Sequence, residues 1–549
     1  MNPFQSKSVV PTPANKNGGV KKSGSWRRKS GLLTITFFVS AWLAYFAIER
    51  FDHQVANLVS GLFAMLATLA GGFWVALRKS IPNYFRLAFL AIPVVGVMAF
   101  LSTYEFSGFS GELVPRFRPR KESKSPSKNL VLPDKSITSL ETDKLPSFRQ
   151  FLGNERVGFI KDMELSEAWD REPPNILWRQ PIGLGWSGFA IQDGLAITME
   201  EFEDRDCLVA FDWNNGGLRW RTSLDGKHFH ALGGGGPCAT PTIEGDRFYS
   251  QSSTGIVSCA ELSSGTLIWQ VDLLKKAHIN KKEAEAAVAW GRSGSPLLYE
   301  DMVIVPFGGA LGKSPAGLIA LDRLTGEERW RGGNDQISYA SPVVMTIQGV
   351  EQIVMVNEAT ATGHEAATGK VMWSYDWPGQ SNGGASVSQP VSIDQELVLL
   401  SKGYGGGALM LDFSKSTKTA FVVTPKWKNA SLLKTKFTSA IFHEGYLYGL
   451  SDGILECVRA EDGKRMWKDA RNGRMGHGQL LVVGKHLLIS SEDGRCILGK
   501  ADPDSFHKLG ELPVLTGITW NTLAIAGNRV YMRNGEQAAC IELQVRSSP

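Results

Sequence analysis

Apolar residues follow two different patterns along the 549-residue chain. Three uncharged apolar runs, 31–48, 55–77 and 87–104, come first, with short charged loops between them. At a rise of about 1.5 Å per residue, each run is long enough to cross a hydrocarbon core of about 30 Å, the shorter runs only just. We therefore predict three transmembrane helices within residues 31–104. The alternative, buried helices of a soluble core, is disfavoured because the loops leave little else for them to pack against.

From about residue 175 onward, short alternating apolar segments separated by turn residues predict β-strands. One eleven-residue phrase ending in Trp recurs about every 40–60 residues, a spacing typical of repeat architectures. Each copy has Gly four residues before the Trp, and most have an acid eight residues before it. The copies are AFDWNNGGLRW, CAELSSGTLIW, ALDRLTGEERW, GHEAATGKVMW and CVRAEDGKRMW, which end at Trp220, Trp269, Trp330, Trp373 and Trp467.

Two further strand signals precede the phrase, so each repeat supplies four strands, or one blade of a β-propeller. A degenerate unit ends at Trp427, and 482–512 keeps the strand rhythm without a Trp. Residues 520–544 supply only three strands. We expect 175–181, NILWRQP, to add the fourth and close the ring, because an open sheet edge invites aggregation. The predicted fold is all-β, an eight-bladed β-propeller of four-stranded blades at 148–549, preceded by three transmembrane α-helices.

These phrases are similar to the A-x-D-x-x-T-G-x-x-x-W repeats of the quinoprotein-like, or PQQ-repeat, family of eight-bladed propellers, over roughly residues 148–544. FRQFLGNERVGF, 148–159, followed by PPNILWRQPIG, resembles the opening of a membrane-anchored bacterial branch of that family. The family includes dehydrogenases that use the quinone and an outer-membrane assembly scaffold that does not. The resemblance therefore implies the fold, and the function has to be argued from the site.

Charge separates the N-terminal region from the propeller. Residues 1–30 are a basic tail that we expect to be disordered, and 105–147 are rich in Pro, Ser and basic residues. We expect 105–147 to be a flexible linker, either solvated or resting on anionic lipid. Residues 1–147 hold 19 Lys and Arg against 8 Asp and Glu, and the whole chain carries +5, so residues 148–549 are net acidic. Nucleic acid is therefore not an expected partner.

Basic residues near the spans also predict the orientation in the membrane. Nine Lys and Arg lie on the side of the tail and the second loop, against six on the opposite side. The positive-inside tendency then places the tail inside and the propeller outside. We expect a multi-pass protein of the bacterial inner (cytoplasmic) membrane with an extracytoplasmic, periplasmic propeller. Its expected partners are the lipid bilayer and other envelope proteins.

Two local features depart from the strand pattern. Residues 275–289, KKAHINKKEAEAAVA, are good helix formers, and we expect this insertion to cover one mouth of the channel. The six cysteines form no C-x-x-C pair. Cys259, Cys457 and Cys540 fall in the repeat column that holds Ala320, so we predict that they are reduced and buried in blade cores.

Residues just before the innermost strands should ring one mouth of the propeller. The candidates are Trp186, Arg292, Tyr339, Asn382, Lys436, His477 and Trp520. Such a ring could hold a small anion or a peptide, and the alternative is a solvated channel lining. No second His or acid stands at ligand spacing from His477, so we predict no metal site there. No motif of nucleophilic or metal-dependent catalysis appears, so we assign no catalytic residue.

Two functional interpretations follow from the resemblance. Quinone-dependent members need groups that stack on the cofactor, a calcium ion with six or more oxygen ligands, and a base for the substrate hydroxyl. We can align no such oxygen set onto this chain, and the adjacent Cys-Cys pair of many such dehydrogenases is absent. We therefore expect a non-catalytic scaffold or binding module without a cofactor. The alternative is a membrane-bound quinoprotein dehydrogenase that uses PQQ and calcium to oxidise an alcohol or a sugar.

Overall fold

The computed structural model divides the chain into two compact units, Met1–Thr103 and Tyr104–Pro549. The structure describes residues 35–36, 38–43, 45–46, 53–76, 78, 81–111, 113–120, 145–161, 163–230, 232–308 and 316–545.

Two long apolar helices dominate the described part of the first unit. They are α2 (His53–Ala76) and α3 (Asn83–Thr103), and both are long and apolar enough to cross a membrane. They correspond to the second and third apolar runs of the sequence. The first run, 31–48, is described only at 35–36, 38–43 and 45–46, where it is helical, and no continuous helix of spanning length is described there. Two candidate spans are therefore seen among the described residues where the sequence analysis predicts three.

The second unit begins with a hairpin that the sequence analysis assigned to a linker. β1 (Tyr104–Phe109) pairs antiparallel with β2 (Pro115–Pro119) directly after α3 ends. The ring of Phe106 contacts Phe109 and, across the pair, Phe117. Over the described residues 105–111 and 113–119, the structure thus has a hairpin where the sequence analysis expects a flexible linker, because the aromatic contacts outweigh the Pro-rich, basic composition. Residues 121–144 of the expected linker lie outside the described residues.

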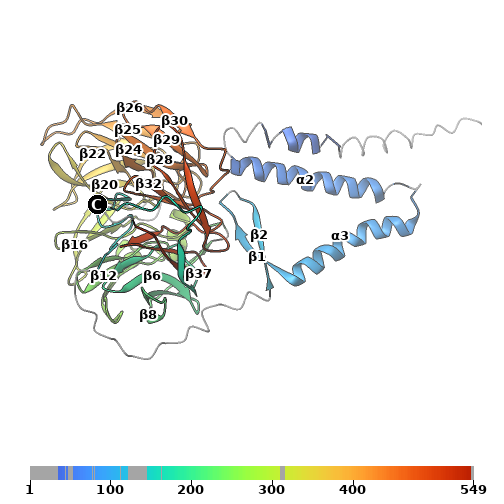
Figure 1. Cartoon of the computed structure of the whole chain (residues 1–549), viewed down its shortest axis with the longest axis horizontal. Helices are drawn as coiled ribbons and strands as arrows, with labels where there is room; N and C mark the ends of the chain where they lie inside the picture. The colour runs from blue at the N-terminus through green and yellow to red at the C-terminus, as the bar shows by residue number, and fades with distance from the viewer. Residues whose placement is uncertain are drawn as a thin grey trace, which may run out of the picture. The chain divides into compact units, whose positions relative to one another are not determined.

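The rest of the second unit consists mainly of antiparallel sheets that radiate from a common axis (Figure 1), as in a β-propeller. The described residues form eight sheets of four or five strands. The first four are β5 (Ala190–Gln192), β6 (Leu195–Phe202), β7 (Arg205–Asp212) and β8 (Leu218–Ser223); β11 (Thr242–Glu244), β12 (Arg247–Gln251), β13 (Ile256–Glu261) and β14 (Leu267–Asp272); β15 (Leu297–Tyr299), β16 (Met302–Pro306), β17 (Leu318–Asp322) and β18 (Glu328–Gly332); and β19 (Val343–Ile347), β20 (Val350–Val356), β21 (Thr360–Glu365) and β22 (Val371–Asp376).

In the next four sheets the neighbouring strands again follow the order of the chain, except that β3 and β4 come from the segment before the first sheet. They are β23 (Val391–Ser392), β24 (Leu397–Lys402), β25 (Gly407–Asp412) and β26 (Thr424–Asn429); β27 (Ile441–His443), β28 (Tyr446–Ser451), β29 (Ile454–Arg459) and β30 (Arg465–Lys468); β31 (Gln479–Val483), β32 (His486–Ser490), β33 (Arg495–Lys500) and β34 (Lys508–Pro513), with β3 (Phe159–Ile160) parallel to β31; and β35 (Ala524–Ala526), β36 (Arg529–Arg533), β37 (Gln537–Glu542) and β4 (Asn175–Pro181). Smaller elements are the hairpin β9 (Phe229–His230) with β10 (Gly234–Gly235) and the helices α4 (Leu273–Ala277) and α5 (Lys281–Ala287).

In six of the eight sheets, the recurring Trp joins the sheet to the next one. It lies in the outermost strand, and its indole N–H donates to a backbone carbonyl in the neighbouring sheet, as in the bond from Trp330 to Ala366 O at 3.2 Å. A buried indole needs such a partner. The same bond runs from Trp178 to Trp213, Trp220 to Leu262, Trp269 to Arg323, Trp427 to Ala460 and Trp467 to Asp502.

The Gly of the phrase allows this close packing. Gly369 has φ +72°, and a Cβ there would lie 2.2 Å from Cε3 of Trp330 in the preceding sheet. Gly is therefore required both by the left-handed backbone and by the ring that covers it. Trp373 is the exception, because its indole bonds to Gln352 Oε1 in its own sheet and packs on Phe413 in the next, where the turn lacks the Gly.

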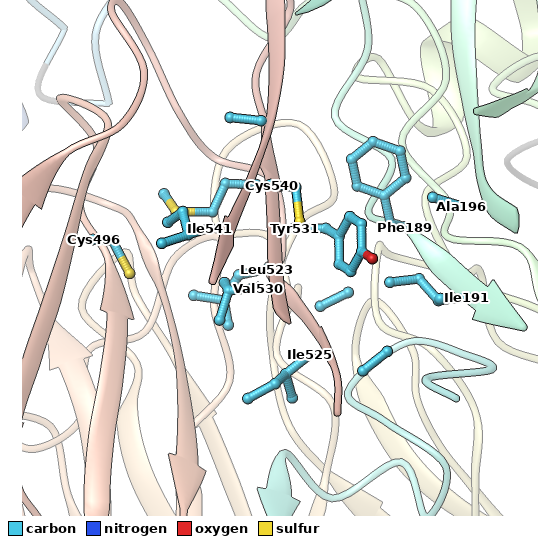
Figure 2. Close-up of a cluster of buried hydrophobic side chains, with 14 of the residues drawn as sticks. Phe189, Ile191, Ala196, Cys496, Leu523, Ile525, Val530, Tyr531, Cys540 and Ile541 are labelled. Atoms are coloured by element: carbon cyan, nitrogen blue, oxygen red, sulfur yellow. The ribbon is translucent and has the colours of Figure 1, made fainter. Parts of the chain in front are cut away.

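The last sheet is completed by the strand that the sequence analysis expects to close the ring. β4 pairs antiparallel with β37 in a register that places Trp178 opposite Cys540. Figure 2 shows the apolar cluster around this sheet, where Tyr531 lies beside Cys540 and faces Phe189, 6.2 Å away between ring centroids. Cys259, Cys457 and Cys540 are buried and free, as predicted.

The segment that precedes the sheets runs across their inner strands. Phe148 N and O both bond to Ile191, while Phe159–Ile160 pairs with β31. Between them, the fully buried guanidinium of Arg156 donates to Ser295 O at 2.9 Å and to Pro296 O at 2.8 Å. Burial lowers the pKa of Arg156 to about 9. The segment therefore ties together sheets that lie far apart in the sequence.

Candidate functional site

The loops before the innermost strands meet at one mouth of the propeller. Trp186 precedes β5, Lys436 precedes β27, His477 precedes β31 and Trp520 precedes β35. Trp186 and Trp520 come from the first and last of these loops, and their ring centroids are 4.6 Å apart. Closure of the ring therefore brings together residues that are more than 300 positions apart in the sequence.

An aromatic row extends from this pair along the mouth. Phe437 lies 4.9 Å from Trp520 and 5.3 Å from His477, measured between ring centroids. The sequence analysis did not select Phe437, although it adjoins the candidate Lys436. The available signal was its place in KTKFTSA, one of the stretches that begin an inner strand. We name Trp520, Phe437 and His477 the aromatic row.

A second aromatic group lies at the mouth. Trp290 stacks on Tyr339 with centroids 5.1 Å apart and also contacts Tyr404, 6.2 Å away. Trp290 N donates to the Tyr339 hydroxyl at 3.2 Å, and burial raises the pKa of that hydroxyl above its usual range. The ammonium of Lys436 lies 5.5 Å from the ring of Tyr404, within range of a cation–π contact.

Two lysines at the mouth are paired with one carboxylate. Lys436 is 1% exposed, and its Nζ lies 3.4 Å from Asp452, whose other oxygen lies 3.0 Å from Nζ of Lys434. Burial acts to raise the pKa of Asp452, but the two lysines outweigh it, so the pKa is lowered. The carboxylate therefore stays ionised and holds both lysines.

His477 is buried and uncharged at neutral pH. Its pKa falls to about 3, first because burial penalises the cation and then because Lys436 and Arg474 repel it. A group of three or more His, Cys, Asp or Glu that could hold a metal ion is not found among the described residues. His477 therefore serves as a wall of the mouth in the described structure.

The turn of the β1–β2 hairpin docks against this wall. Ser110 and Gly111 are buried, and Gly111 N donates to Glu492 Oε1 at 2.7 Å. The other oxygen of Glu492 accepts from His477 N at 2.9 Å. A Cβ on Gly111 would lie 2.2 Å from Cδ2 of His477. Sequence reasoning missed this contact because it assigned the hairpin to a linker.

Two of the sequence candidates support the loops and do not join the cluster. Arg292 is buried, donates to the carbonyls of Pro306 and Phe307, and has its pKa lowered to about 10 by burial. Asn382 donates to Ala286 O at 2.7 Å and accepts from Ala289 N at 2.9 Å. It therefore fastens the end of the helical insertion to a neighbouring loop.

A buried acid lies outside the mouth cluster and was not singled out from the sequence. Asp206 is buried beside Ser253, which donates to Oδ2 at 3.1 Å. Burial raises the pKa of Asp206 to about 7, more than this hydrogen bond lowers it. The nearby charge of Glu201 raises the pKa of Asp206 further, and that of Lys281 lowers it.

The mouth does not fit calcium and a quinone well. Calcium needs six or more oxygen ligands, but both oxygens of Glu492 accept backbone N–H groups and Asp452 holds two lysines. The guanidinium of Arg292, a candidate for holding an anion, donates its hydrogen bonds to backbone carbonyls. The ring of Trp520 is buried against Trp186 and Phe437, so a planar group would have to stack there in place of one of these rings. We therefore derive no catalytic step through such a group.

Comparison with known proteins adds a family and a fold. Residues 167–333 and 204–469, together more than half of the chain, match the PQQ-repeat family described as outer membrane protein assembly factor BamB. The structure of a europium-containing methanol dehydrogenase is similar, with a TM-score of 0.53 at 10% identity over 72% of this chain and 90% of that chain. No protein of curated function matches.

Two further solved structures are similar to this chain. Quinohemoprotein alcohol dehydrogenase from Comamonas testosteroni has a TM-score of 0.52 at 12% identity and covers 74% of this chain and 82% of its own. BamB from Moraxella catarrhalis has a TM-score of 0.43 at 13% identity, and the match covers 64% of this chain and 95% of that chain. At such identities the two dehydrogenase structures show a common fold alone.

Proposed function

The chain belongs to the PQQ-repeat β-propeller family, and from this premise we propose that it is a non-catalytic, membrane-anchored scaffold or binding module of the cell envelope. The observation that carries the proposal is the use of the mouth's charged groups. Glu492 holds backbone N–H groups and Asp452 holds Lys434 and Lys436. Because these carboxylates already have partners within the chain, they are not free to hold a metal ion or a cofactor. This supports a mouth that binds another protein rather than a cofactor.

We take each four- or five-stranded sheet as one blade, which makes an eight-bladed ring. The pairing of β4 with β37 supports a closed ring, because it joins the segment before the first sheet to the last strand. A closed ring leaves no sheet edge free for unwanted pairing. The loops at its mouth then form a rigid frame on which binding residues can be displayed.

Membrane anchoring is the second part of the proposal. It is supported by α2 and α3, and the apolar run 31–48 would provide a third span. The distribution of basic residues favours the tail inside and the propeller outside an inner membrane. The partners would be the bilayer and other envelope proteins. The net acidic propeller argues against nucleic acid as a partner.

The alternative is a PQQ-dependent dehydrogenase of an alcohol or a sugar. The observation that favours it is the pair of Trp186 and Trp520, whose rings offer a stacking surface for a planar cofactor. The engaged carboxylates at the same mouth argue against it, because calcium would have to take Glu492 or Asp452 from its present partners.

Reconstitution with the quinone and calcium separates the two functions. Full-length protein in detergent would be titrated with PQQ and calcium, followed by absorbance, and then supplied with alcohols or sugars and a redox dye. We expect no binding tighter than the high micromolar range, about −5 to −6 kcal/mol, and no turnover. Stoichiometric binding or steady dye reduction would refute the scaffold function. The effect should then be lost in Trp520→Ala and kept in the control variant Trp467→Phe, which lies away from the mouth.

A further inference from the structure

We propose that the propeller mouth is a binding site for a glycine-containing β-turn, and that the chain's own β1–β2 turn is its resident ligand. Any other ligand of the mouth then has to displace this turn. The claim goes beyond the proposed function, because it would hold for a scaffold and for an enzyme alike. It rests on the contacts of Gly111 with Glu492 and His477.

The acceptor for the turn is a preformed carboxylate. Glu492 is 6% exposed, its N donates to Met475 O at 2.8 Å, and its O accepts from Thr519 N at 2.9 Å. The loop is therefore held on both sides before the turn binds. A hydrogen bond from an N–H to a carboxylate is stronger than one between neutral groups. The Gly111 N–H therefore meets an oriented anionic acceptor.

The wall beside this acceptor selects glycine. A Cβ at Gly111 would approach Cδ2 of His477 to 2.2 Å and Cγ to 3.0 Å. The imidazole has little room to retreat, because it is 1% exposed and packs on Phe437 of the aromatic row. Gly111 does not have a positive φ, so alanine could adopt its backbone. The requirement for glycine is therefore steric and comes from the mouth.

The hairpin matches the site in its own geometry. Ser110 N bonds to Val114 O at 2.9 Å and Leu113 N bonds to Ser110 O at 2.9 Å, so the turn closes on itself. These bonds leave Gly111 N for the carboxylate of Glu492. A ligand of the same class would be a tight turn that presents one backbone N–H at a glycine. The turn is thus recognised by its backbone and by the lack of a side chain.

Hydrogen exchange of the full-length protein in detergent tests whether the turn is docked. Gly111→Ala should raise exchange in residues 104–119 at least tenfold, because the new methyl collides with His477. His477→Ala alone should raise exchange less than Gly111→Ala does, since it removes the hydrogen bond between the imidazole and the Gly111 backbone but leaves the bond from Gly111 N to Glu492. The double variant should exchange as slowly as His477→Ala alone, because the methyl then has room. Fast exchange in the wild type, or no response to Gly111→Ala, would overturn the proposal.

A competition experiment tests whether the mouth is a binding site in its own right. A labelled, cyclised peptide of residues 104–119 would be added to the Gly111→Ala protein and to the wild type, with anisotropy as the readout. We expect saturable binding to the Gly111→Ala protein, at least tenfold weaker binding to the wild type, and none by a peptide carrying the same Gly111→Ala change. No binding to the vacated mouth would overturn the proposal. Quinone and calcium are left out, so either result is independent of the proposed function.

Discussion

Replacing Gly369 by alanine should destabilise the propeller because of the contact between neighbouring sheets. Gly369 lies under the indole of Trp330, and a Cβ would come within 2.2 Å of that ring at φ +72°. Gly245 is the matched control, since it has φ +61° but no atom lies within 4 Å of the position that its methyl group would take. The two substitutions share the backbone strain, and only Gly369→Ala adds a collision.

The loss in unfolding free energy follows from the backbone strain and the contacts at each glycine. An alanine in the left-handed region costs about 1–2 kcal/mol, and overpacking a filled site costs about 1–3 kcal/mol more. Displacing the ring also weakens the bond from Trp330 to Ala366 O, worth about 1 kcal/mol. We therefore expect losses in unfolding free energy of about 3–6 kcal/mol for Gly369→Ala and about 1–2 kcal/mol for Gly245→Ala.

Thermal unfolding of the full-length protein in detergent, followed by Trp fluorescence, measures the difference. An unfolding entropy of about 2.1 cal/mol/K per residue over roughly 400 propeller residues makes 1 kcal/mol equal to about 1.2 °C in Tm. Gly369→Ala should then lower Tm by about 4–7 °C and Gly245→Ala by about 1–2 °C. Adding Trp330→Leu to Gly369→Ala should cost less than the sum of the single losses. Equal losses for the two glycines would refute the reasoning.

Three further predictions concern a buried acid, the thiols and the topology. Because the pKa of Asp206 is raised to about 7, the folded state holds an extra proton between about pH 4 and 7 and loses stability as pH rises through that window. Asp206→Asn should therefore stabilise the protein at pH 8, by up to about 4 kcal/mol, and give no gain at pH 4.5; a gain of equal size at both would contradict the assignment. Without any reductant, Cys259, Cys457 and Cys540 should react with an alkylating agent after the protein is denatured and not before. A disulfide at any of the three, detected by mass spectrometry, would contradict this prediction. Protease added to spheroplasts should digest the propeller and spare the N-terminal tail, and the opposite pattern would overturn the proposed orientation.

The repeat phrase made most of the propeller predictable. Trp330 and Gly369 illustrate why, since each is fixed by a local turn and by one contact with the neighbouring sheet. In each copy of the phrase the Gly also stands four residues before the Trp. The closing strand β4 could also be found from the sequence, because the last sheet lacked one strand and Trp178 had no other place. Periodic patterns report the contacts that repeat in every blade.

The candidate site was less predictable because its contacts do not repeat. Arg292 and Asn382 were selected by their place before inner strands, but each is used by loop carbonyls or amides in the structure. Phe437 joins two selected residues and was overlooked, since nothing periodic marks it. The docking of Gly111 depends on a pairing across 381 positions, and composition assigned its hairpin to a linker. Such contacts become visible only when the chain is folded.

A cryo-EM structure of the full-length protein in a lipid nanodisc, prepared with excess PQQ and calcium, tests the central claim most directly. We expect the mouth to contain the β1–β2 turn, with Gly111 at Glu492 and with Asp452 still between Lys434 and Lys436. No density for a planar cofactor should appear on the aromatic row. A quinone stacked on Trp520, with calcium bound to Glu492 or Asp452 and the turn displaced, would contradict the account and establish the dehydrogenase.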